Sequence, residues 1–275
     1  MLTETFHSIA AATRKVFTNW RATLLLAIVY ASLLAALYFF VAVREASLGQ
    51  VVVTFALAIL APLLFFVLQA MVAGQTDEAT AGSLLRRSLA SFWKLILISL
   101  PLIACAVLIA YLLSKAQAHW GVGVTNPDEP EIPRRIASAA NPHPARPIDW
   151  KVALLSTVRY LTFGLILPLA AIHLWLATEH EGLLAAIKRI TTHLGRAFAP
   201  QSVLIYIAGF LIFAVAPYFL LFRTTPTKHA WLEVSLFVVR LVVVFALTLF
   251  GWAITVRALG ENSDNPGPDL ANEAV

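Results

Sequence analysis

The apolar residues of this 275-residue chain fall into long blocks that short polar stretches separate. A helix needs about 20 mostly apolar residues to cross the hydrocarbon core of a membrane. Six blocks reach this length, and we predict that each one forms a transmembrane helix. The six blocks are Ala22–Val43, Val51–Ala73, Leu95–Leu113, Val152–Ala177, Ser202–Phe222 and Val234–Val256. The pattern therefore predicts an all-α fold, a polytopic membrane helix bundle with six transmembrane helices in residues 1–259.

Two of these blocks have features that are unusual for a transmembrane helix. The first follows basic residues, as a signal peptide does, but it is longer than the roughly 7–15 apolar residues of a signal peptide and has no small-residue cleavage site. The sixth contains Arg240, whose cost of about 3 kcal/mol at a helix centre is smaller than the summed gain from its Leu, Ile, Phe and Val residues. We interpret the first block as an uncleaved span and the sixth as a full span.

Two polar connectors between spans have the pattern of amphipathic helices. The first connector, Thr76–Trp93, and the second connector, Leu183–Phe198, repeat apolar residues every three or four positions. Cations lie opposite the apolar positions, which predicts two interfacial amphipathic helices in the headgroup plane. The cationic positions are Arg86 and Arg87 in the first connector and Lys188 and Arg189 in the second. Each connector lies between two spans, so the chain contains two parallel copies of span, connector and span.

Two segments outside the spans have a different composition. Residues 116–150 contain six prolines and few apolar residues, so we predict an extended loop outside the membrane. Residues 260–275 are acidic and contain two prolines, and we predict a disordered tail.

The overall composition supports a membrane location. Hydrophobic residues make up 60% of the chain and charged residues only 13%, whereas about a quarter of the residues in a soluble domain are charged. The formal net charge is +5, and the basic residues flank the apolar blocks. This distribution predicts contact with anionic headgroups of membrane lipids and gives no indication of nucleic-acid binding. Cations before the first span favour a cytoplasmic N-terminus, and six spans return the C-terminus to the cytoplasm.

A motif at the start of the second connector reads Glu181-Gly182-Leu183-Leu184-Ala185-Ala186-Ile187-Lys188-Arg189. It resembles a Glu-Gly-x-x-x-Ala-x-Lys-Arg stretch after the fourth span in a group of bacterial six-span membrane proteins. The group includes the membrane domain of some glycerophosphoryl diester phosphodiesterases and stand-alone relatives of unknown function. A weaker echo, Gly82-Ser83-Leu84-Leu85-Arg86-Arg87-Ser88, occurs in the first connector. The resemblance implies a bacterial inner-membrane protein without catalytic residues, because the phosphodiesterase chemistry belongs to a separate soluble domain.

Arg159 and Arg240 are the two cations inside predicted spans. Each lies about 12 Å along its helix from the outer end, at a rise of about 1.5 Å per residue. If their faces converge, the two guanidiniums form a site for a phosphate or carboxylate group. Alternatively, Glu233 neutralises one of them, or each side chain extends to the outer headgroups with the help of local carbonyls.

Other polar residues in the spans indicate structure rather than chemistry. Gln69 and His173 fit hydrogen bonds between helices. His173 and His180 share a helical face, but the spacing offers no third ligand, so we predict neither a metal site nor a cofactor. No Asp or Glu lies in the middle of a span, which argues against an ion-coupled pump. Motifs for nucleophilic catalysis or nucleotide binding are missing, and we predict that the chain is not an enzyme.

These features favour an integral membrane protein without a catalytic centre, which interacts with lipids or with a membrane-protein partner in the bacterial envelope. The alternative is a transporter, or the membrane subunit of one, in which Arg159 and Arg240 bind an anionic substrate.

Overall fold

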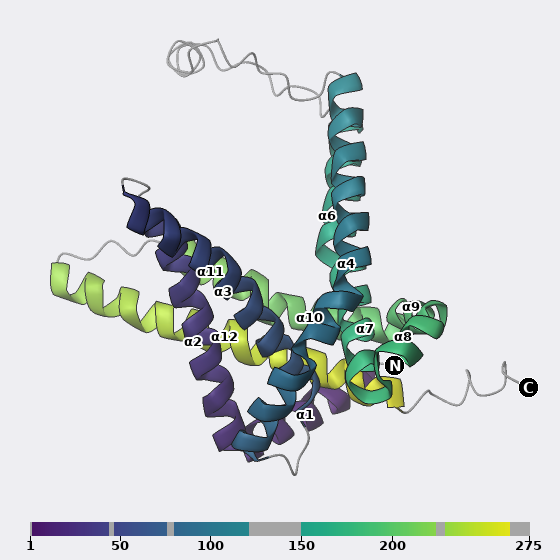
Figure 1. The fold of residues 1–275 in the computed structure, drawn as a ribbon, viewed down its shortest axis with the longest axis horizontal. Coiled ribbons are helices and arrows are strands. Elements are labelled where there is room, and N and C mark those ends of the chain that lie inside the picture. Colours follow the sequence, from purple (N-terminus) through teal and green to yellow (C-terminus); the bar gives the residue numbers. More distant parts are fainter. Residues whose placement is uncertain (1, 44–46, 76–79, 121–149, 224–228, 265–275) are drawn as a thin grey trace, which may run out of the picture. The chain divides into compact units, whose positions relative to one another are not determined.

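The computed structural model describes residues 2–43, 47–75, 80–120, 150–223 and 229–264 (Figure 1). Every regular element in these ranges is a helix. Most of the predicted loop and residues 265–275 of the predicted tail lie outside the described residues.

Six helical segments among the described residues are long and apolar enough to cross a membrane. This confirms the predicted all-α, polytopic architecture, and the chain is built as an integral membrane protein. Two spans contain a π-helical turn: the fourth joins α6, η1 and α7, and the fifth joins α10, η2 and α11. The helices are α1 (Leu2–Thr18), α2 (Trp20–Ala42), α3 (Leu48–Ala73), α4 (Ala81–His119), α6 (Trp150–Leu161), η1 (Thr162–Ile166), α7 (Leu167–Glu181), α8 (Leu183–Lys188), α9 (Ile190–Ala197), α10 (Pro200–Phe210), η2 (Leu211–Val215), α11 (Ala216–Phe222) and α12 (Ala230–Asp264).

The helices divide into two compact units. Unit 1 holds Met1–Ser99 and Leu169–Val275, and unit 2 holds Leu100–Pro168. Unit 1 therefore contains α1, α2, α3, the first half of α4 and the helices from α7 to α12. Unit 2 contains the second half of α4 together with α6 and η1.

Two tryptophans inside unit 1 donate hydrogen bonds to polar groups on neighbouring helices. Trp175 Nε1 of α7 donates to Ser99 Oγ of α4 at 2.8 Å, and Trp252 Nε1 of α12 donates to Gln69 Oε1 of α3 at 2.9 Å. The second bond confirms the interhelical role predicted for Gln69. A bond of this kind contributes on the order of 1 kcal/mol to helix association in lipid.

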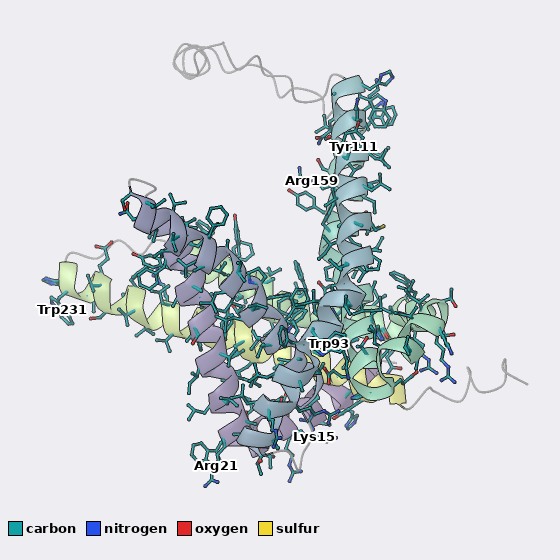
Figure 2. All side chains as sticks on the ribbon, in the orientation of Figure 1. Lys15, Arg21, Trp93, Tyr111, Arg159 and Trp231 are labelled. Carbon is teal, nitrogen blue, oxygen red and sulfur yellow. The ribbon has the colours of Figure 1, made fainter. Side chains whose placement is uncertain are left out.

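The outward side chains of the spans are largely apolar (Figure 2). Phe55 of α3 and Val242 of α12 are 67% and 62% exposed, and apolar surface of this extent is typical of contact with lipid. Exposed tryptophans lie at or near the ends of spans, where aromatic side chains mark the level of the headgroups. They include Trp20, Trp150 and Trp231.

The fifth and sixth spans pack through glycines. A Cβ atom at Gly209 of α10 would overlap the side chain of Thr255 in α12. A Cβ atom at Gly251 of α12 would lie 2.9 Å from Phe213 Cβ of η2. Small residues at such positions let two helix backbones approach closely, which is the usual packing mode between transmembrane helices.

The two connectors differ from the separate helices that the sequence pattern predicts. The described part of the first connector, residues 81–93, forms the first turns of α4, a single helix of 39 residues. The second connector is divided at Arg189, whose φ of −108° and ψ of 23° are not helical, and Pro200 begins α10. Residues 76–79 lie outside the described residues. The location of both connectors in the headgroup plane stays a prediction.

Both ends of the chain contain helix that the sequence pattern does not predict. α12 continues to Asp264, so residues 260–264 are helical and the predicted disordered tail does not begin at Gly260. In this extension, Glu261 Oε1 accepts a hydrogen bond from Lys15 Nζ of α1. α1 precedes the first span and packs against α12. Helices α1 and α12 therefore lie side by side.

Candidate functional site

α7 ends in two carboxylates, Glu179 and Glu181, which we name the acidic end of α7. The helix ends there because Gly182 adopts a φ of +88°, a conformation that is strained for any residue with a Cβ. The Gly182 N–H still donates to the carbonyl of Thr178 at 3.1 Å. The two carboxylates therefore lie where the fourth span ends and the second connector begins.

Glu179 joins the acidic end of α7 to the first connector. Its side chain is only 3% exposed, and Oε2 lies 3.9 Å from Arg87 Nε. Arg87 Nη2 also donates to the Glu179 carbonyl at 3.4 Å. A Cβ atom at Gly74 would lie 3.7 Å from the same Oε2, so the end of α3 packs against the carboxylate. Helices α3, α4 and α7 therefore meet at one buried charge.

Further polar atoms are buried in the N-terminal part of α4, after α3 and at the end of α7. Ser88 Oγ and Ser91 Oγ of α4, Gln75 Nε2 after α3 and Glu179 Oε1 form no hydrogen bond within the described part of the chain. A buried polar atom without a partner costs about 1–3 kcal/mol. This region therefore offers both donors and acceptors to water or to a polar ligand.

Glu181 joins the acidic end of α7 to the second connector. Its Oε2 lies 3.7 Å from Arg189 Nη1 and 3.7 Å from His193 Nε2. The Glu181 side chain is one-third exposed, whereas the His193 side chain is buried. The carboxylate therefore ties α9 to the end of α7 from the surface.

The four cations predicted from the connector pattern fall into two groups, two that pair with described carboxylates and two that do not. Arg87 and Arg189 are each paired with a carboxylate, although their side chains remain 53% and 70% exposed. Arg86 and Lys188 are exposed, and neither forms an ion pair with a residue that the structure describes. Arg87 and Arg189 therefore hold the connectors against α7, while Arg86 and Lys188 leave their charges available to other groups.

Helix α1 joins the same end of unit 1 (Figure 2). Lys15 Nζ lies 2.7 Å from Glu261 Oε1, and Arg257 Nε lies 3.6 Å from that oxygen. A Cβ atom at Gly260 would lie 3.5 Å from Leu176 Cδ2, so the end of α12 packs against the end of α7. Both connectors, α1 and the ends of α7 and α12 therefore share one face, which we name the connector face.

The two arginines predicted inside spans belong to different units. Arg159 is exposed on α6 in unit 2, and Arg240 lies on α12 in unit 1. Arg240 Nη1 donates a hydrogen bond to the backbone carbonyl of Arg223. Such a local carbonyl contact is what the alternative interpretation of this residue expects. The shared anion site stays a prediction.

The two histidines of the fourth span occupy different environments. His173 is buried within α7, whereas His180 is exposed near its end. The described residues contain no group of three or more His, Cys, Asp or Glu side chains that could hold a metal ion.

The sequence pattern did not predict two parts of the connector face, helix α1 and the buried carboxylate of Glu179. Thr5, Ala12 and Val16 form the buried side of α1, and their spacing of seven and four residues is a signal that an amphipathic helix leaves in a sequence. Glu179 gives no comparable signal, because a carboxylate at the end of an apolar block is usually solvated. Its burial depends on α3 and α4, which are distant in sequence.

Comparisons of the chain with protein-family models, with curated proteins and with solved structures find no match.

Proposed function

We propose that this integral membrane protein is a non-catalytic component of the bacterial inner membrane that binds anionic lipid headgroups at its connector face. The connector face then lies on the cytoplasmic side, with both chain ends. A neighbouring membrane protein that carries acidic groups is an additional partner of the same chemistry.

One observation carries the proposal: the cations of the connectors serve two different purposes. Arg87 and Arg189 are occupied by Glu179 and Glu181, which fixes the connectors against α7. Arg86, next to Arg87, and Lys188, next to Arg189, remain exposed. A lysine or arginine near an anionic membrane surface contributes about 1 kcal/mol of attraction. Two such residues held on anchored backbone fit a site for lipid phosphate.

The alternative function, a transporter with Arg159 and Arg240 as its anion site, has less support. The guanidinium of Arg240 is engaged by the Arg223 carbonyl, and the two arginines belong to different units. The proposal that the chain is not an enzyme rests on the missing catalytic motifs in the sequence.

Neutralising the two exposed cations tests the proposal. The double variant Arg86→Gln/Lys188→Gln should retain less phosphatidylglycerol than the unmodified protein after purification in mild detergent. Two cations correspond to about 2 kcal/mol, or roughly a 30-fold lower affinity. Native mass spectrometry of the purified protein counts the bound anionic and zwitterionic lipids.

The matched control is Lys115→Gln/Lys151→Gln, which makes the same change in net charge near the end of α4 and at the start of α6. This control should retain phosphatidylglycerol like the unmodified protein. Equal retention by all three proteins would refute the proposed headgroup site.

A further inference from the structure

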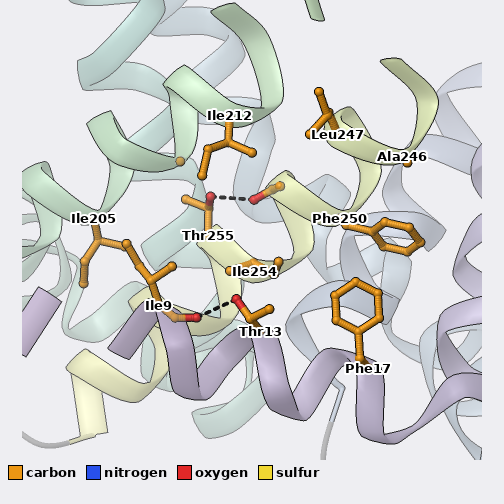
Figure 3. A pocket seen from close by; sticks show the side chains of 12 residues that line it. Ile9, Thr13, Phe17, Ile205, Ile212, Ala246, Leu247, Phe250, Ile254 and Thr255 are labelled. Carbon is orange, nitrogen blue, oxygen red and sulfur yellow. Dashed lines mark hydrogen bonds between the residues drawn. The ribbon is translucent and has the colours of Figure 1, made fainter. Parts of the chain in front are cut away.

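A cavity of about 260 Å³ lies between α1, α10, η2 and α12 in unit 1 (Figure 3). Ile9, Thr13 and Phe17 line it from α1, and Ile205 and Ile212 line it from the fifth span. Its volume falls just below the roughly 300–1,000 Å³ of pockets that enclose whole drug-sized molecules. The cavity therefore matches a segment of a chain better than a complete lipid.

The cavity is lined by apolar side chains and by two threonines whose hydroxyl groups already form hydrogen bonds. Thr13 and Thr255 are the polar side chains among the lining residues. Thr13 Oγ1 donates to the Ile9 carbonyl at 2.7 Å, and Thr255 Oγ1 donates to the Gly251 carbonyl at 2.6 Å (Figure 3). Both hydroxyl protons are thus used within their own helices. An apolar cavity of this kind excludes water and takes hydrocarbon.

The geometry of α1 places one cation beside the cavity. Ile9, Thr13 and Phe17 recur every four residues and form one stripe along the helix. At about 100° per residue, Arg14 lies on one side of this stripe, and the buried residues of α1 lie on the other. Arg14 is exposed and pairs with no carboxylate among the described residues, whereas Lys15 is held by Glu261.

We infer that this cavity binds one acyl chain of an anionic phospholipid, whose phosphate is bound by Arg14. The inference rests on the proposed function, because it extends headgroup binding on the connector face to a specific lipid site. Bilayer hydrocarbon is as apolar as the cavity, so transfer of the chain gains little from the hydrophobic effect. Selectivity comes from close packing in the cavity and from the charge of Arg14.

A photoactivatable lipid tests this site. The full chain is reconstituted in nanodiscs that contain phosphatidylglycerol with a diazirine in one acyl chain, and the adducts are mapped by mass spectrometry after illumination. We expect adducts in two peptides, one covering Ile9–Phe17 and one covering Ala246–Thr255. Ala246→Phe fills the cavity from α12 and should lose these adducts. Val238→Phe adds the same ring at a 51% exposed position outside the cavity and should keep them.

The headgroup is tested separately. Phosphatidylcholine with the same diazirine chain should give fewer adducts, and Arg14→Gln should reduce the preference for phosphatidylglycerol about fivefold, the effect of one cation near the membrane surface. If Ala246→Phe does not fold, Ile9→Trp fills the cavity from α1.

Unchanged adducts in a folded cavity-filling variant, or adducts spread evenly over the lipid-facing helices, would overturn the inference. These outcomes are independent of the connector cations. Loss of adducts in Ala246→Phe together with unchanged lipid retention in Arg86→Gln/Lys188→Gln would instead refute the proposed function and leave the cavity site in place.

Discussion

The two copies of span, connector and span share a sequence pattern but differ in their backbones. In the first copy, α3 and α4 remain α-helical through Pro62 and Pro101. In the second copy, each span contains a π turn that ends two residues before a proline. The turn η1 precedes Pro168, and the turn η2 precedes Pro217.

In the second copy, the π turn accommodates the proline that follows it, whereas the first copy holds its prolines in continuous α-helix. A proline ring in a helix collides with the carbonyl four residues earlier, and the wider π turn moves that carbonyl away. The Leu167 N–H donates to the carbonyl of Thr162, and the Ala216 N–H donates to that of Leu211. A π turn thus ends two residues before each of these two prolines. The periodicity of apolar residues predicts the two spans but does not predict these π turns.

The connectors of the two copies also differ in how they are anchored. Arg87 of the first connector pairs with Glu179, a carboxylate in the interior. Arg189 of the second connector pairs with Glu181, which is one-third exposed. The first connector is therefore tied to the core of unit 1, and the second is tied to its surface. Variants of each copy test how much these differences contribute to stability.

The largest effect is expected at Gly209 in the second copy. Gly209→Ala places a Cβ atom on the side chain of Thr255, and such overpacking costs about 1–3 kcal/mol. The matched variant in the first copy is Gly82→Ala, where a Cβ atom meets nothing within 4 Å. This variant should be neutral or slightly stabilising, because alanine favours helix. Thermal unfolding in detergent measures both, and equal midpoints would contradict close packing between α10 and α12.

A smaller effect is expected from the two arginine–carboxylate pairs. Arg87→Ala leaves the buried carboxylate of Glu179 without its counterion. Because Arg87 itself is half exposed, we expect a loss of about 1–3 kcal/mol, below the full cost of breaking a buried pair. Arg189→Ala breaks a surface pair, whose contribution is about 0–1 kcal/mol. The free energy of unfolding of both variants in the same detergent decides the order, and a larger loss for Arg189→Ala would reverse the assigned anchoring.

The sequence predicts the spans well because lipid imposes a single requirement on them. A run of about 20 apolar residues has few alternatives to a membrane-spanning helix. Gln69 was also predictable, since a lone amide in a span needs a partner on another helix. The continuity of α4 had a signal as well, because no proline or glycine lies between Gly82 and Pro101.

Tertiary contacts explain what the sequence pattern missed. The last turns of α12 contact Lys15 of α1, which lies almost a whole chain away from Glu261 in sequence. The burial of Glu179 depends on Gly74 and Arg87. The difference in ion pairing between Arg86 and Arg87 depends on which side of α4 faces α7. Periodicity identifies the cations of a helix, but only the packed structure separates anchored cations from exposed ones.

We predict that six crossings bring both connectors to one face of the membrane. Cysteine accessibility tests it directly, after Cys105, the single cysteine, is replaced by Cys105→Ala. Single variants Arg86→Cys, Lys188→Cys, Ser47→Cys and Trp231→Cys are then treated with a membrane-impermeant maleimide in intact and in permeabilised cells. We expect positions 86 and 188 to react only after permeabilisation, whereas positions 47 and 231 should react in intact cells. Labelling of positions 86 and 188 from opposite sides would contradict it.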